Sequence, residues 1–226
     1  HVKSIVAIRP EPGLSATLAA GRELGLPIEG WPLFEIGPVA WQLPDPDEID
    51  ALLIGSANAL RHAGPEIGAF RGKPVHAVGL ATAQFAQEEG FTVASVGERG
   101  LQGVLDALAG RDLGLLRLAG AERITLAIPP AIQVTERIVY ESAALPMPDG
   151  LVARLAKGAV VLMHSAAAAR HFVNEVSRLS LAREGIDLAA LGPRIIEAAG
   201  EGWGSAAFAA SPNDKALLAL AKDMCH

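Results

Sequence analysis

Cysteine is almost absent from this sequence of 226 residues. The one cysteine, Cys225, has no second cysteine with which to form a disulfide, and it cannot build a thiolate metal cluster alone. Proteins without a disulfide framework are typical of reducing compartments. The sequence therefore favours the cytoplasm.

Long hydrophobic runs are lacking as well. Half of the residues are hydrophobic (50%), but charges or prolines interrupt each apolar stretch well before the roughly 20 residues that a membrane-spanning helix needs. The opening residues HVKSIVAI show none of the charged, long apolar and cleavage regions of a secretory signal. We expect a cytoplasmic protein that does not associate with membranes.

An excess of positive charge is also missing. Lys and Arg number 19 against 25 Asp and Glu, which gives a formal net charge of −6. Proteins that bind nucleic acids over a broad surface carry clustered cations. The composition therefore argues against a nucleic-acid partner, although it leaves room for a local basic cleft.

Several common catalytic signatures are absent. The sequence has no GxxxxGK[ST] phosphate loop and no GxSxG nucleophile motif, and the glycines in 200–204 do not open a helix directly after a strand. His164 and His171 lie seven residues apart without a third ligand at metal-binding spacing. We expect neither a cofactor nor a metal site.

An internal repeat is the most informative feature that is present. The stretch 53–62 reads LIGSANALRH and the stretch 162–171 reads LMHSAAAARH, with Leu, Ser, two Ala, Arg and His at matched positions. Each stretch follows an apolar run, and each is followed by a second apolar run that ends in glycine. The pattern predicts a duplicated α/β unit.

Apolar runs of strand length alternate with segments of helical pattern along most of the chain, which is typical of parallel α/β proteins. Aromatic residues are scarce at 4% and alanine is abundant, which suits helices packed on sheets. The predicted strands are 5–8, 27–33, 52–54, 75–78, 92–96, 115–118, 134–140, 160–163, 188–191 and 205–210, and the predicted helices are 14–24, 57–62, 82–89, 103–108, 166–179, 194–199 and 213–222.

Counting strands predicts how the chain divides. The first copy of the repeat supplies four strands, whereas the second supplies three and needs the two N-terminal strands to complete its sheet. We therefore expect a discontinuous α/β domain of residues 1–36 and 142–226 with an inserted α/β domain of residues 37–141. The crossings, at about 34–46 and 134–148, are expected to form a two-stranded linker that acts as a hinge.

Turns that follow the strands are the candidate binding sites, because ligands of open α/β sheets bind at the carboxyl ends of the strands. Ser56 and Ser165 are predicted to cap helices and to leave backbone N–H groups that suit an anion. The full set of turn residues is Ser56, Ala57, Asn58, Gly79, Thr82, Ser165, Ala166, Gly192 and Arg194. Cations that would bind a carboxylate-rich ligand there are Arg9, Arg61, Arg123, Arg170 and Arg194.

An ordered set of short motifs resembles one known family. The set consists of Ile8-Arg9-Pro10, GSANA at 55–59, AVGLATA at 77–83, Leu118-Ala119-Gly120 with Arg123 beyond it, RIVY at 137–140, LMHSA at 162–166 and ALGP at 190–193. In this order the motifs resemble those of uroporphyrinogen-III synthase, a cofactor-free enzyme of tetrapyrrole (haem) biosynthesis. The resemblance implies the two-domain fold with a two-stranded linker and one discontinuous domain.

The same resemblance implies the reaction. Its substrate is hydroxymethylbilane, a linear tetrapyrrole with eight carboxylates, which loses its terminal hydroxyl to give an azafulvene. Attack at the substituted carbon of ring D, through a spiro intermediate, inverts that ring and closes uroporphyrinogen III. Tyr140 occupies the family's tyrosine position and is the expected proton donor, while Gly120, Arg123 and the turn residues are expected to bind substrate.

The sequence also departs from the family. Arg194 and Ile195 stand where many relatives have a hydroxyl residue, and Pro129-Pro130 shortens the crossover that follows Arg123. An alternative function stays open, namely a two-domain binding or sensor protein for an anionic small molecule without catalysis. The upstream hydroxymethylbilane synthase is the one expected protein partner, and a monomer is the expected state.

Overall fold

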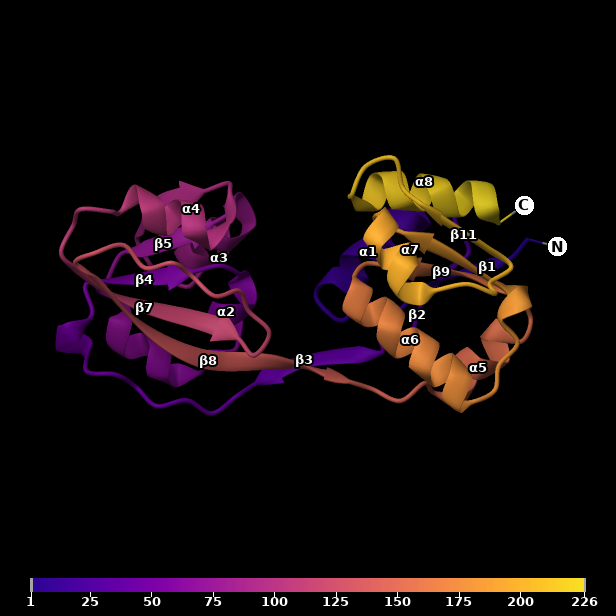
Figure 1. Cartoon of the computed structure of the whole chain (residues 1–226), viewed down its shortest axis with the longest axis horizontal. Coiled ribbons are helices and arrows are strands. Elements are labelled where there is room, and N and C mark those ends of the chain that lie inside the picture. Colours follow the sequence, from indigo (N-terminus) through magenta and orange to yellow (C-terminus); the bar gives the residue numbers. More distant parts are fainter. Residues whose placement is uncertain (1, 226) are drawn as a thin grey trace. The chain divides into compact units, whose positions relative to one another are not determined.

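The computed structural model describes residues 2–225 and contains two compact units (Figure 1). One unit comprises the residues up to Glu35 and those from Ala143 onward, and the other comprises Ile36–Ser142. Among residues 2–225, no helix is long and apolar enough to cross a membrane. We call the first of the two units the discontinuous unit and the second the inserted unit.

The discontinuous unit is built on a five-stranded sheet in the order β11-β10-β9-β1-β2, in which all neighbouring strands are parallel. Its strands are β1 (Ser4–Ala7), β2 (Ile28–Gly30), β9 (Ala159–Met163), β10 (Ile186–Ala190) and β11 (Ser205–Phe208). Its helices are α1 (Gly13–Glu23), α5 (Asp149–Leu155), α6 (Ala166–Arg178), α7 (Pro193–Ala199) and α8 (Asp214–Met224), with a 3-10 turn at Arg183–Gly185.

Alternating side chains of these strands form two cores, because successive residues of a strand point to opposite faces of its sheet. Ile5 and Ala7 pack with α1 and α8, whereas Val6 and Ile8 pack with α5, α6 and α7. The central strands are apolar on both faces, as expected of a parallel sheet covered by helices on both sides.

The inserted unit is built on a six-stranded sheet in the order β3-β8-β7-β4-β5-β6, in which β6, β5, β4, β7 and β8 pair in parallel. Its strands are β3 (Phe34–Pro38), β4 (Ala51–Ile54), β5 (Val75–Val78), β6 (Val93–Gly97), β7 (Leu113–Gly120) and β8 (Ile132–Ala144). Its helices are α2 (Ala57–Arg61), α3 (Leu80–Glu88) and α4 (Gly100–Ala107), with 3-10 turns at Pro46–Glu48 and Pro65–Phe70.

The two faces of this second sheet are covered differently. Leu52 and Ile54 pack toward α2 and α3, whereas Ala51 and Leu53 pack toward α4. Residues 121–130, which connect β7 to β8, form neither helix nor strand, so the predicted abbreviated crossover is confirmed. The face with α4 therefore carries an extended connection where a second helix would otherwise lie.

The predicted fold class is confirmed: each unit is a mainly parallel sheet flanked by helices. Both passages of the chain between the units lie in β3 and β8, which are neighbours in one sheet. The linker is therefore two-stranded.

Two details of the predicted elements were wrong. The strand expected over 27–33 is shorter, since β2 ends at Gly30 and β3 begins only at Phe34, because Pro32 lacks the N–H that a continuous ladder needs. Helix α5 was not predicted, since its sequence is only seven residues long and contains Gly150. A Cβ atom at Gly150 would lie 2.4 Å from the Trp31 ring, so packing requires glycine there.

Candidate active site

The order of strands in the inserted unit creates a crevice between β4 and β7. From β4 the chain proceeds to β5 and β6 on one side, and it then returns to β7 on the other side. The loops that leave these two neighbouring strands therefore diverge, and such a switch point is where open α/β sheets bind ligands.

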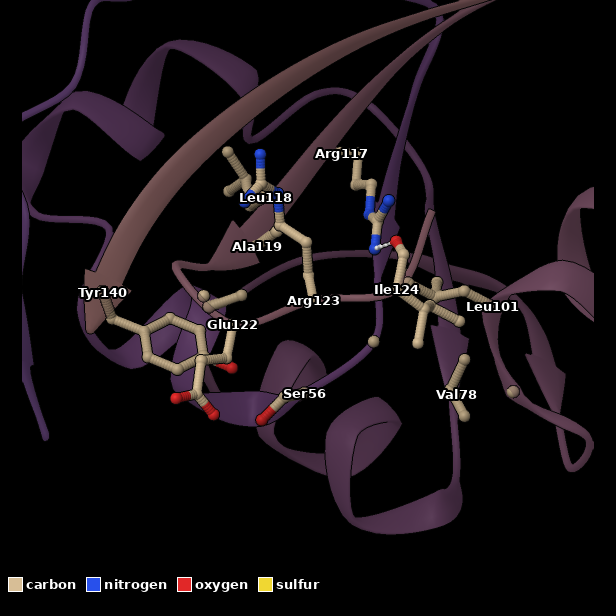
Figure 2. Close-up of a pocket in the computed structure, with 14 residues that line it drawn as sticks. Ser56, Val78, Leu101, Arg117, Leu118, Ala119, Glu122, Arg123, Ile124 and Tyr140 are labelled. Carbon is tan, nitrogen blue, oxygen red and sulfur yellow. Dashed lines mark hydrogen bonds between the residues drawn. The ribbon is translucent and has the colours of Figure 1, made fainter. Parts of the chain in front are cut away.

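A pocket of about 230 Å³ lies at this switch point (Figure 2). Four residues that the sequence predicted to bind or transform substrate line it. They are Ser56 after β4, Gly120 at the end of β7, Arg123 in the loop that follows and Tyr140 in β8. The remaining lining residues are Gly55, Ala59, Val78, Gly100, Leu101, Arg117, Leu118, Ala119, Glu122 and Ile124.

Ser56 begins α2 as predicted, because its extended backbone lets the side-chain oxygen accept a hydrogen bond from Asn58 N at 3.3 Å. Ala57 and Asn58 form the first turn, and the Asn58 side chain accepts a hydrogen bond from Arg61. Since α2 has only five residues, its dipole is weaker than that of a long helix. The loop at Ser56 therefore offers a ligand mainly its backbone groups and a hydroxyl, and only a small charge from the dipole of α2.

Tyr140 lies against Gly120. Parallel pairing places the two residues opposite one another, and Ala121 N donates a hydrogen bond to Tyr140 O at 2.9 Å. A Cβ atom at position 120 would lie 2.7 Å from Cζ of the tyrosine ring, so only glycine allows this approach. The tyrosine ring is half-buried, and the His62 ring lies beside it with centroids 6.1 Å apart.

The Tyr140 side chain lines the pocket (Figure 2). A phenolic hydroxyl is a hydrogen-bond donor. The hydroxyl can therefore donate a hydrogen bond to a ligand in the pocket.

The turn after β5 begins at Gly79, whose φ of 78° favours glycine. Gly79 N donates a hydrogen bond to Gly97 O at 2.8 Å, which joins the ends of β5 and β6. Thr82 is buried in α3 with 6% of its surface exposed, and it does not line the pocket. Gly79 therefore lies along the same edge of the sheet as Ser56, whereas Thr82 packs in the core.

Two arginines on the pocket wall share the carboxylate of Glu136. Arg117 Nη1 lies 2.9 Å from Glu136 Oε2, and Arg123 Nε lies 2.6 Å from Glu136 Oε1. Arg123 Nη1 also donates to Ala121 O at 2.9 Å. These contacts concentrate positive charge beside the pocket although the whole chain is acidic.

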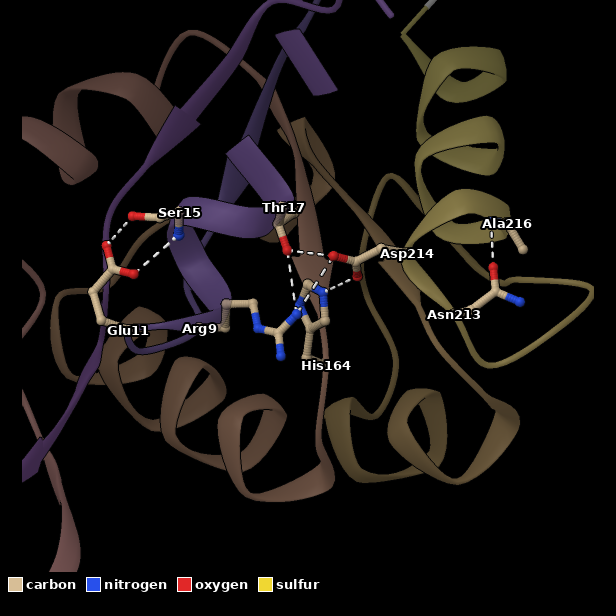
Figure 3. A network of polar contacts seen from close by, with 8 residues as sticks. All are labelled: Arg9, Glu11, Ser15, Thr17, His164, Asn213, Asp214 and Ala216. Atoms are coloured by element: carbon tan, nitrogen blue, oxygen red, sulfur yellow. Dashed lines mark hydrogen bonds and ion pairs between the residues drawn. The ribbon is translucent and has the colours of Figure 1, made fainter. Parts of the chain in front are cut away.

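The discontinuous unit has its own switch point, between β1 and β9, because the chain places β2 on one side of β1 and returns to β9 on the other. Arg9 follows β1 and His164 follows β9. Asp214, at the start of α8, joins them (Figure 3). Its carboxylate lies 2.8 Å from His164 Nε2 and 3.5 Å from Arg9 Nη1, and it accepts a hydrogen bond from Thr17 at 2.5 Å.

Burial, more than any other cause, lowers the pKa of His164 below its ordinary value, and the hydrogen bond to Asp214 offsets this only in part. The ring is then neutral at pH 7, and its Nε2–H donates to Asp214. Burial alone would raise the pKa of the Asp214 carboxyl, but hydrogen bonds from Thr17 and His164 outweigh it and keep that pKa low. Asp214 is therefore a carboxylate that holds Arg9 by charge.

Other predicted residues of this unit lie along the same edge. Ser165 caps α6 as predicted, with its oxygen accepting a hydrogen bond from Ala168 N at 3.0 Å, and Ala166 is the first residue of this 13-residue helix. Gly192 precedes α7 in an extended conformation, and Arg194 is exposed in the first turn of α7. Arg170 is an exposed residue of α6.

Some features of these sites were not predicted from the sequence. Arg117 stands inside the apolar run LLRLAG, and a cation within a buried strand signals a partner on a neighbouring strand. The network of Thr17, His164 and Asp214 joins residues up to 197 positions apart, and no local pattern announces such a contact.

Comparison with known proteins places this geometry in context. A family model described as "Uroporphyrinogen-III synthase HemD" matches residues 15–219. The crystal structure of uroporphyrinogen-III synthetase from Helicobacter pylori is similar at 17% sequence identity and a TM-score of 0.66, over 98% of this chain and 99% of that chain. That of a mutant uroporphyrinogen III synthase from Thermus thermophilus is similar at 14% identity and a TM-score of 0.50, over 98% of this chain and 97% of that chain. No curated protein matches the sequence.

Proposed function

The chain belongs to the uroporphyrinogen-III synthase family, since the family model matches residues 15–219, and from this premise we propose how its residues perform the family's reaction. The enzyme converts hydroxymethylbilane to uroporphyrinogen III, with inversion of ring D and loss of water. No observation on residues 2–225 favours the alternative of a binding protein without catalysis.

The enzyme has to control which isomer forms more than it has to activate the substrate. Hydroxymethylbilane cyclises unaided to the type I isomer, so the enzyme must hold ring D for attack at its substituted carbon and must stabilise charge that develops as the hydroxyl departs. A site made of backbone groups, a hydroxyl donor and cations suits this task. The pocket of the inserted unit provides these groups.

Tyr140 is the proposed general acid. As the bond from carbon to the terminal oxygen breaks, the phenol donates its proton and the hydroxyl leaves as water. The pyrrole nitrogen loses its proton as the azafulvene forms, and the phenolate takes up a proton again. The step therefore consumes no external acid and leaves the tyrosine protonated for the next turnover.

The observation that supports this assignment most directly is the convergence of Ser56, Gly120, Arg123 and Tyr140 on one pocket. The four residues come from loops and strands separated by up to 84 positions, between Ser56 and Tyr140. We propose that the backbone at Ser56, Ala57, Asn58 and Gly79 binds polar groups of the substrate. Thr82, which is buried in α3, is retained as a support of that turn.

Residues at the switch point of the discontinuous unit are proposed to bind substrate carboxylates. Arg9 provides a guanidinium held by Asp214, and Ser165 with Ala166 opens a helix long enough to carry a substantial dipole. Arg194 is the proposed replacement for the hydroxyl residue of many relatives, because its exposed cation can pair with a carboxylate. Gly192 lets the substrate approach the backbone beside it.

The wider setting is also a proposal. The division of the chain into the discontinuous unit and the inserted unit supports a discontinuous domain of residues 1–36 and 142–226 and an inserted domain of residues 37–141. A cytoplasmic location suits Cys225, which is buried and has no second cysteine in the sequence with which to pair. Transfer of hydroxymethylbilane from its upstream synthase remains a prediction that a binding assay between the two enzymes would test.

Tyr140→Phe tests the proposed acid. The substitution removes one hydroxyl and keeps the ring that packs on Gly120, so we expect kcat for type III product to fall about a hundredfold while KM changes less than about threefold. Initial rates with freshly generated hydroxymethylbilane measure both constants.

Thr135→Val is the matched control, because it removes a hydroxyl from the same strand at a residue that does not line the pocket. Its kcat should equal that of the parent. A Tyr140→Phe enzyme with parental kcat would disprove the assignment of the acid without affecting the family assignment.

A further inference from the structure

Arg117 is an unusual residue for its position. It lies within β7 between the buried residues Leu116 and Leu118, and its side chain is only 4% exposed. Parallel pairing places Glu136 of β8 directly opposite Arg117. The register of two strands therefore builds the ion pair, and no flexible loop is needed to form it.

The positive charges around Arg117 outnumber the negative ones. Removing an arginine from water costs several kcal/mol unless its charge is paired and its donors are satisfied. Glu136 would neutralise Arg117 alone, but it also binds Arg123, so two cations share one carboxylate. The cluster formed by Arg117, Arg123 and Glu136 carries a net charge of +1.

One donor of the buried arginine is also unused. Arg117 Nη1 contacts Glu136 and Arg117 Nη2 donates to Ile124 O at 2.9 Å, but Nε is buried without a hydrogen-bond partner among residues 2–225. A buried donor that lacks an acceptor destabilises the folded state, because it has lost its hydrogen bonds to water without replacement. A purely structural ion pair would gain nothing from this arrangement.

The cluster lies on the wall of the Tyr140 pocket. Arg117 and Arg123 both line that pocket, and both also line an adjoining one of about 370 Å³ that is bounded by the extended connection 124–128 and by β8. Figure 2 shows both arginines on the same side of the pocket, with Ile124 next to Arg117. An anion that enters from the pocket meets Arg123 first, because its side chain is 37% exposed.

We propose that Arg117, Arg123 and Glu136 form a carboxylate-binding subsite for one acidic side chain of the linear tetrapyrrole, which rests on the proposed function. The incoming carboxylate accepts hydrogen bonds from the Arg123 guanidinium and replaces Glu136 there, while Glu136 keeps its contact with Arg117. Arginine suits this exchange since its planar fork matches a carboxylate.

Glu136 then has a second role as the resident competitor of the substrate. Its carboxylate holds both guanidiniums in place when the pocket is empty, and its charge opposes the binding of another anion. Glu136 lines the adjoining pocket, whereas Glu122 lines the Tyr140 pocket itself, and its charge also opposes an anion. The subsite is therefore expected to bind strongly at low ionic strength and weakly at high ionic strength.

The first test is Arg123→Gln in the chain of 226 residues. Arg123 is partly exposed, so the variant should fold, and we expect KM for hydroxymethylbilane to rise about tenfold, as loss of one charge-assisted hydrogen bond implies. The value of kcat should change less than about twofold. Arg111→Gln is the matched control, because it removes the same charge from an exposed residue just before β7, outside both pockets.

The second test removes a negative charge from the subsite instead of a positive one. Glu136→Gln removes the competing charge, so in a variant that folds we expect KM to fall by about threefold or more at low ionic strength. A purely structural role of Glu136 would make KM rise or stay constant, because disordering the arginines cannot improve binding. A parental or higher KM in folded Glu136→Gln overturns the proposal.

A binding measurement separates this inference from the proposed function. Uroporphyrin I, a cyclic octacarboxylate that undergoes no turnover, is titrated into each variant and followed by its fluorescence. Weaker binding to Arg123→Gln and tighter binding to Glu136→Gln support the subsite even if Tyr140 is not the acid. Equal affinity of the parent, Arg123→Gln and Arg111→Gln overturns it, whatever the synthase activity of the parent.

Discussion

At the scale of single residues, the contact between Gly120 and Tyr140 is the most restrictive feature of the pocket. The glycine is needed for space rather than for an unusual backbone conformation, because a Cβ atom there would lie 2.7 Å from the tyrosine ring. The Tyr140 hydroxyl can act on the substrate only if its ring stays in contact with Gly120.

Gly120→Ala should therefore act through Tyr140. The added methyl group forces the ring to shift, and we expect kcat to fall about tenfold or more, since displacement by about 1 Å suffices to lower catalysis strongly. Gly103→Ala is the control, because the nearest atom to its new Cβ would be 3.4 Å away and alanine favours helix α4. Steady-state kinetics of the two variants decide; equal kcat for Gly120→Ala and the parent would contradict a positioned acid.

Residue-scale predictions from sequence succeeded where a local signal exists. Ser56 and Ser165 were predicted as helix caps because each stands between an apolar run and a helical pattern, and both form the expected hydrogen bonds. Arg117 was not singled out, because its significance depends on the register that places Glu136 opposite it. Arg117 and Glu136 are 19 positions apart, and register over such a separation has no local sequence signature.

At the scale of elements, the predicted strands agree best where both faces of the sheet are covered. Strands β4 and β9 are continuous apolar runs because helices pack on both sides, so the runs themselves mark the strands. Helix α5 lacks such a signal. Leu151 and Leu155 bury one face of it, and tertiary packing overrides the low helix propensity of Gly150.

Helix α6 stabilises the segment that leads to α5 through a buried carboxylate. Glu175 accepts hydrogen bonds from Arg178 Nε at 2.9 Å and from Met147 N at 2.7 Å, and these contacts, that of Arg178 above all, lower the pKa of Glu175 to about 2. Because the folded-state pKa lies below the unfolded value, the contribution to stability is present above pH 4.5 and is lost as pH falls toward about 2.

Glu175→Gln should therefore lower the free energy of unfolding by about 1–3 kcal/mol at pH 7. The difference from the parent should shrink as pH falls from 4.5 to about 2. Urea titrations followed by circular dichroism at several pH values measure it, with Glu197→Gln on the exposed side of α7 as control. A difference that is constant between pH 7 and pH 2.5 would contradict the charged role of Glu175.

At the scale of the whole molecule, the internal repeat carried most of the information. Two matched segments predicted two parallel α/β sheets, and counting strands predicted that the N-terminal pair joins the sheet of the second copy. The structure has β1 and β2 in one sheet with β9, β10 and β11. Which charged residues gather at each sheet edge could not be predicted, because that depends on strand order and register together.

As a member of its family, this chain directs cyclisation of hydroxymethylbilane to the type III isomer. The most direct test mixes the protein with freshly generated hydroxymethylbilane, oxidises the products and separates the uroporphyrin isomers by chromatography against a sample without protein. We predict that type III predominates and forms faster than the spontaneous product. Type I formed at the spontaneous rate by correctly folded protein would contradict the account.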